Sequence, residues 1–173
     1  MADFTDSHKE EMGGNYFEEG IHLVKVLLVE FDETDKGKEY IELTLSDDEG
    51  DKEARVRMWF TTDGAIKYTF NTLRAIFVHN ADEGKKDEVR TKFDSLKNTE
   101  ELDKACQKML IGKECWLQVS QKGIYLDGQG NARPNYDRNI YGYEPSPRVS
   151  TEEAVAEINK PLEGPNGEKI SAF

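Results

Sequence analysis

Long apolar runs are lacking in this sequence, and cysteines are few. It has no apolar run long enough to cross a membrane, and residues 1–11 are acidic, unlike the basic and apolar start of a signal peptide. We therefore expect a cytoplasmic protein with no membrane partner. The only two cysteines, Cys106 and Cys115, lie far from other soft ligands. We expect them to be reduced and buried, and we expect neither a disulfide nor a zinc site.

Catalytic motifs are also lacking. No nucleophile has a base beside it, the three histidines have no metal-ligand spacing, and the glycines at 128 and 130 form no phosphate-binding loop. The turns at 32–40 and 47–53 are rich in carboxylates but lack the glycine and the terminal glutamate of an EF-hand. We predict that the protein is not an enzyme and binds no cofactor. We rank a metal-dependent nuclease that uses these carboxylates well below a function in binding.

Negative charge is in excess, but it is unevenly distributed. The chain has 35 Asp and Glu against 23 Lys and Arg, for a net charge of -12. Residues 52–78 reverse the sign, with five basic residues and two acidic ones, in a region that is also rich in aromatic residues. Such segregation indicates a local basic surface on an acidic protein.

Hydrophobic periodicity predicts a mainly β protein with helices. Three strands are expected at 21–31, 39–46 and 54–60, joined by compact turns into an antiparallel meander. Spacings of three and four residues then predict helices from Thr62 or Asp63, within 82–97, and at 99–110. Two more strands are expected at 113–121 and 135–145. This order predicts a five-stranded β-barrel, the OB-fold, with a helical insertion between strands three and four.

The chain divides into three parts on this interpretation. Residues 1–19 are expected to be a flexible acidic N-terminus, and residues 20–145 the OB-fold domain that binds nucleic acid. Residues 146–173 have few large apolar side chains, which predicts a flexible acidic tail with one short helix at 151–159.

Several stretches of the sequence resemble a known family. They are "GIHLVKV" with "KGKEYIELTL", then "ARVRMWF", and "IGKECWLQV" leading to "NIYGYEP". Over residues 20–145 the chain resembles the phage-encoded OB-fold single-stranded DNA-binding proteins. The resemblance implies a barrel that coats single strands during phage DNA replication, recombination or repair, in the host cytoplasm. It also implies a tail that recruits replication or recombination proteins; here "GEKISAF" ends in Phe173 but lacks a preceding run of Asp.

The stretch "EARVRMWF" carries the candidate binding surface. Side chains alternate across a strand, so Arg55, Arg57 and Trp59 share the face opposite Val56 and its apolar neighbours. Proteins that bind single strands combine positive charge with aromatic rings on which bases stack. The candidate nucleic-acid-binding residues are Tyr40, Arg55, Arg57, Trp59, Trp116, Lys122, Arg133, Arg138 and Tyr141.

Some alternatives stay open. Tryptophans are buried on average, but the apolar face of the third strand already supplies core residues, so we favour a ligand-facing Trp59. In the fourth strand Cys115, Leu117 and Val119 are expected to face inward and Trp116, Gln118 and Ser120 outward, with the role of Trp116 undecided. The register of the fifth strand and the presence of a homodimer are also open. The alternative function is an OB-fold interaction module, in a replication or virion assembly, that binds an acidic peptide.

Overall fold

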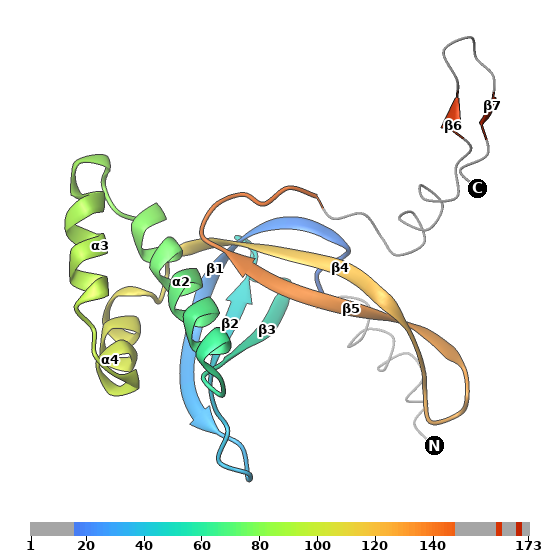
Figure 1. The fold of residues 1–173 in the computed structure, drawn as a ribbon, viewed down its shortest axis with the longest axis horizontal. Coiled ribbons are helices and arrows are strands. Elements are labelled where there is room, and N and C mark those ends of the chain that lie inside the picture. Colours follow the sequence, from blue (N-terminus) through green and yellow to red (C-terminus); the bar gives the residue numbers. More distant parts are fainter. Residues whose placement is uncertain (1–15, 148–161, 164–168, 171–173) are drawn as a thin grey trace.

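The computed structural model describes residues 16–147, together with the backbone of 162–163 and 169–170. The predicted tail and its helix therefore lie almost entirely outside the described residues. The elements, drawn in Figure 1, are β1 (Gly20–Glu33), β2 (Glu39–Ser46), β3 (Glu53–Trp59), α2 (Asp63–His79), the 3-10 turn η1 (Glu83–Lys85), α3 (Lys86–Asp94), α4 (Thr99–Met109), β4 (Glu114–Leu126), β5 (Ala132–Tyr141), and the short pair β6 (Leu162–Glu163) and β7 (Lys169–Ile170).

The five long strands form one sheet in the order β3-β2-β1-β4-β5. Every neighbouring pair is antiparallel. The predicted class, mainly β with helices inserted between the third and fourth strands, is confirmed. Within residues 16–147 no ladder joins β3 to β5, so the sheet is open and has these two strands as its edges. The finer prediction of a closed barrel stays a prediction.

The core lies on one face of this sheet. Alternate residues of β2, β3 and β4 are buried there, as their patterns predict. β1 keeps its apolar side chains on this face through a bulge between Val26 and Leu28, so that Val26 and Val29 are both buried. The strand residues of the core are Val24, Val26, Val29, Ile41, Leu43, Leu45, Ala54, Val56, Met58, Cys115, Leu117, Val119 and Ile140.

Helix α2 covers this core. It begins where Thr62 Oγ1 accepts a hydrogen bond from the backbone N–H of Ala65, at 3.1 Å. Its apolar stripe buries Leu73 and Ile76 completely. The hydroxyl of Thr69, farther along α2, donates to the carbonyl oxygen of Trp59 at 2.9 Å. This bond ties α2 to the end of β3.

Helices α3 and α4 lie beyond α2 (Figure 1). Phe93 of α3 is buried between two aromatic rings of α2, with centroids 4.6 Å from Phe70 and 5.1 Å from Phe77. The side chain of Asn98 caps α4 by accepting from the N–H of Glu101 at 2.9 Å. The charged insertion is therefore helical, as predicted, and it packs through a few aromatic residues.

Strands β4 and β5 extend into the stretch of residues 122–134 that was expected to separate them. The pairing of β1 with β4 ends at Gly20 and Val119, whereas β4 and β5 stay paired as far as Leu126 and Ala132. The two strands continue as a two-stranded arm that projects from the sheet (Figure 1). The connection between the two strands is confined to a turn at 127–131, and β5 starts and ends earlier than the predicted 135–145.

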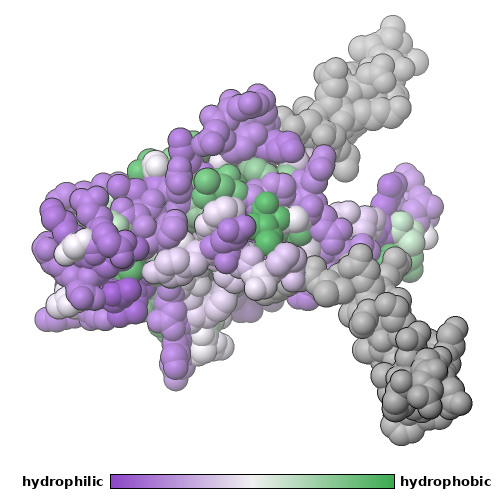
Figure 2. Space-filling view, turned by 90° about the horizontal axis from the view of Figure 1, so that it is seen from above, coloured by the Kyte–Doolittle hydropathy of each residue, from purple (hydrophilic) through white to green (hydrophobic). Residues whose placement is uncertain are grey.

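Hydrophilic residues cover most of the face in Figure 2, and apolar residues gather near its middle. Among the described residues, no helix combines the length and the apolar character that crossing a membrane requires.

Candidate nucleic-acid interface

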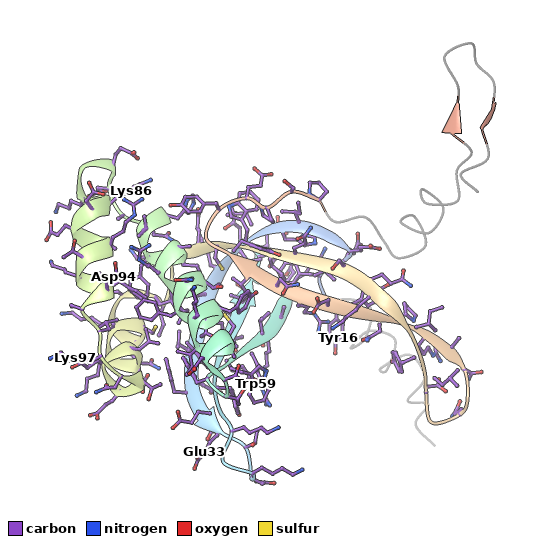
Figure 3. The ribbon with its side chains drawn as sticks, in the orientation of Figure 1. Tyr16, Glu33, Trp59, Lys86, Asp94 and Lys97 are labelled. Carbon is purple, nitrogen blue, oxygen red and sulfur yellow. The ribbon has the colours of Figure 1, made fainter. Side chains whose placement is uncertain are left out.

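Tyr40 and Trp59 form an aromatic pair on the sheet face opposite the core. They are cross-strand partners in β2 and β3, with ring centroids 5.3 Å apart and planes inclined at 59°. The guanidinium carbon of Arg57 lies 4.3 Å from the centroid of the Tyr40 ring, a cation–π contact. Both aromatic side chains are half-buried and Arg57 is exposed. The structure thus brings three predicted residues into one cluster, at the end of the sheet where Figure 3 labels Trp59.

The charge of Arg57 is balanced by a residue that was not predicted for the site. Glu42, its cross-strand partner, accepts a hydrogen bond from Arg57 Nε at 2.7 Å. This bond is the main reason that the pKa of Arg57 is raised above its ordinary value. The alternation of β2 already set Glu42 on the face of Tyr40, so the sequence contained the signal for this ion pair.

The guanidinium of Arg55 is held less tightly by other residues than that of Arg57, so it is more available to a ligand. It lies opposite Thr44, and its nearest ion-pair contact, Nε to Glu53 Oε1, is 3.9 Å long between exposed side chains. Exposed pairs of this kind contribute little. Arg55 and Arg138 line one hollow of about 510 Å³ that also includes Tyr16. The two edge strands thus contribute one arginine each to the same surface depression.

Sequence reasoning missed Tyr16, which is about half exposed (51%) in this hollow. Phe17, the next residue, is buried in the core and its ring lies 5.1 Å from that of His22. Phe17 precedes the predicted start of the domain at Gly20. The aromatic dipeptide directly before the first strand was the available signal, because an apolar residue there can anchor the chain and orient its neighbour.

Trp116 and Tyr141 lie apart from this cluster. They are cross-strand partners in β4 and β5, both half-buried, and Trp116 also lies opposite Leu23 of β1. Tyr40 lies opposite Asp32, near the other end of β1. Leu23 and Asp32 are separated by nine residues of strand, roughly 30 Å along the chain. The structure therefore does not bring Trp116 and Trp59 together.

The remaining predicted cations lie on or near the arm. Arg133 Nε donates to Asp127 Oδ2 at 3.1 Å across the hairpin turn. Lys122 is exposed and has no ion pair within residues 16–147. Arg138 lies opposite Val119, so it projects to the core side of β5, where it is half-buried at the hollow.

The outward face of β4 is covered, which its sequence does not show. Gln118 and Ser120, expected to face outward, alternate with the inward residues but are buried, with exposed fractions of 2% and 7%. The chain that follows β5 covers Gln118, whose Nε2 donates to the carbonyl oxygen of Ser146 at 3.1 Å. The predicted inward residues of this strand are buried as expected.

The predicted burial of both cysteines is confirmed. Cys106 and Cys115 are free and buried, and burial raises the pKa of each thiol to about 12. Across the described ranges, His, Cys, Asp and Glu side chains form no group of three or more that could hold a metal ion.

No model of a known protein family matches the sequence, and no curated protein matches it either. The interpretation of the site therefore depends on its own geometry. That geometry consists of one aromatic–arginine cluster, one hollow with two arginines, and one arm with an unpaired lysine among the described residues.

Proposed function

We propose that this protein binds single-stranded DNA without sequence preference, and that its sheet is a partly open OB-type barrel. An OB barrel has five strands, is often incompletely closed, and binds ligands over strands two and three. The strand order, the helices between β3 and β4, and the shared hollow of the two edge strands all support this fold.

The observation that carries the function is the cluster of Tyr40, Arg57 and Trp59 on the exposed face of β2 and β3. Stacking on an aromatic side chain contributes roughly 1–3 kcal/mol per base and does not depend on which base it is. A guanidinium beside the rings offers a hydrogen-bond fork to phosphate or a flat surface to a base. The cluster supplies these two kinds of contact within one corner of the sheet.

The surrounding charges favour a ligand that tracks from this cluster toward the arm. Arg57 is held by Glu42, so the cations that remain more available are Arg55, Arg138 and Lys122. They continue from β3 across the hollow to β5 and the arm. Asp51 and Glu53 also line the hollow, so a strand of phosphates on this line would pass beside the acidic turn at 47–53 and would depend on the arginines to offset its charge.

The deciding experiment is a titration with poly-dT that follows tryptophan fluorescence at several salt concentrations. We expect quenching, affinity that falls steeply with salt, and much weaker binding of a duplex of equal length. Equal affinity for duplex and single strand would rule out the proposal. Poly-glutamate in the same assay tests the alternative: if it competes as well as poly-dT, the face binds acidic peptides.

The region beyond residue 147 enters the proposal only as a partner-recruiting segment. It lies outside the described residues, apart from the backbone of β6 and β7. A chain truncated after residue 147 should still bind poly-dT. It should no longer bind any replication or recombination protein that the full chain binds.

A further inference from the structure

A groove lies between the far ends of β1 and β2 and the start of α4. It consists of two adjoining hollows of about 320 and 390 Å³ that share Glu39, Phe60 and Thr99. The groove is on the core side of the sheet, since Glu33 and Glu39 lie two residues from the core-facing Phe31 and Ile41 and therefore share their face. Tyr40 also lines the first hollow, so the groove adjoins the aromatic cluster at this end of the sheet, but Arg55 and Arg57 project from the opposite face and line neither hollow.

The floor of the groove is apolar. Phe31 and Phe60 stack there with centroids 5.9 Å apart and planes inclined at only 16°. Ile66 and Phe70 of α2 and Leu96 continue the floor in the second hollow. Ile66 is 42% exposed although it lies on a helix that packs against the core. An open apolar surface with a polar rim is typical of a site that binds a protein segment.

The rim of the groove is acidic. Glu33 and Glu39 are direct cross-strand partners, and like charges in that position destabilise a sheet. Neither carboxylate has an ion pair among the described residues. Asp32, Glu100 and Asp103 also line the first hollow, which has no basic residue in its lining, whereas Lys97 lines the second hollow. The local repulsion is therefore uncompensated, and a cation bound between Glu33 and Glu39 would relieve it.

We propose that this groove binds a cationic amphipathic segment of a partner protein, with apolar side chains on the phenylalanine floor and Lys or Arg against the carboxylate rim. Amphipathic helices bind apolar grooves in this way, and complementary charge fixes their orientation. This inference goes beyond DNA binding, because phosphates would be repelled by the rim.

Charge also argues against the other occupants. Residues 1–15 contain four acidic residues and one basic residue, and residues 148–173 contain five acidic and three basic, so neither end of this chain complements the rim. A second copy would bring a net charge of -12. A basic segment of a different protein is the occupant that the groove fits.

The test uses a fluorescein-labelled peptide of about 14 residues with leucines and lysines at helical spacing, long enough to form a helix on binding. The protein is the full chain. Two control peptides keep the lysines but replace the leucines by serine, or keep the leucines but replace the lysines by glutamate. Binding is measured by fluorescence anisotropy, and the melting temperature of each variant confirms that it is folded.

Two pairs of matched variants locate the binding. The double variant Glu33→Gln, Glu39→Gln should weaken binding of the leucine–lysine peptide by about tenfold. The control Asp48→Asn, Glu49→Gln makes the same charge change beyond the opposite end of β2 and should change binding by less than about twofold. Ile66→Ser should weaken binding by a similar factor, whereas Ile111→Ser, at an equally exposed isoleucine (44%), should not.

Three outcomes would overturn the proposal. Equal loss in both charge variants, or equal binding of the serine–lysine peptide, would mean that the peptide senses only overall charge. A dimer of the full chain that Ile66→Ser converts to a monomer would make a second copy the occupant. Poly-dT affinity, measured on the same variants, should stay unchanged, so a failure here is distinguishable from a failure of DNA binding.

Discussion

Tyr40 and Trp59 lie directly opposite each other across β2 and β3, with their ring centroids 5.3 Å apart, and Arg57 rests on the Tyr40 ring. Each aromatic residue leaves part of its surface exposed on the face away from the core. The pair therefore contributes to packing on one side and offers a stacking surface on the other.

Replacing Trp59 by Ala should weaken poly-dT binding by roughly 1–3 kcal/mol, the contribution of one stacked base. Trp59→Phe should retain most of the affinity, because a smaller ring still stacks. Fluorescence anisotropy with labelled poly-dT measures both variants, and thermal unfolding checks that each is folded. If the Phe and Ala variants bind equally well, the ring of Trp59 does not contact DNA.

Removing the partner of Arg57 should strengthen DNA binding. Glu42→Gln leaves the guanidinium in place without its counter-charge, so poly-dT should bind more tightly and its salt dependence should steepen by about one phosphate contact. Glu39→Gln changes the net charge equally but lies on the other face of β2, where no effect on DNA is expected. An equal gain in both variants would mean that overall charge, and not Arg57, controls affinity.

How much of this site could be read from the sequence depends on whether the information is local. The alternation of β3 was enough to predict that Arg55, Arg57 and Trp59 face away from Val56 and Met58, because side-chain direction has a period of two residues. The pairing of Tyr40 with Trp59 needed only the register of one short hairpin.

Other features depend on distant parts of the chain. Trp116 and Trp59 were grouped from composition, but β1 pairs with β2 along one part and β4 along another, and this separates them. The continuation of β4 and β5 through Gly123 and Pro134 goes against the preferences of both residues, which tertiary pairing overrides. Burial of Gln118 requires the chain after β5, whose path no local pattern predicts.

The two thiols should be unreactive in the folded protein. Burial raises the pKa of Cys106 and of Cys115 to about 12, so almost no thiolate is present at pH 8. We expect a thiol reagent such as DTNB to label neither cysteine in native conditions and both after unfolding in denaturant. Rapid labelling of one native cysteine would show that its part of the core opens readily.

The turn of the arm should loosen in acid. The pKa of Asp127 is lowered, first by the backbone N–H of Asn131 and then by Arg133. A lowered folded-state pKa means that the stabilisation is complete above the ordinary pKa, about 4, and is lost as pH falls through the lower folded value. The amide signals of Gln129 and Asn131, followed by NMR, should shift with a midpoint below that ordinary value. In Asp127→Asn this transition should disappear.

Gly142 should tolerate no side chain, because α2 passes too close. A Cβ atom there would lie 2.4 Å from the carbonyl carbon of Ala75 and 2.6 Å from its oxygen, and these backbone atoms cannot move without shifting the helix. Gly142→Ala should therefore lower the free energy of unfolding by about 1–3 kcal/mol, the usual effect of overpacking. Gly128, in the turn of the arm, has open space around it, so Gly128→Ala provides the control and should leave stability within about 0.5 kcal/mol. Urea denaturation of both variants measures the difference. Equal stability of the two variants would mean that the segment after β5 is not packed against α2, and the cover over Gln118 would then be absent as well.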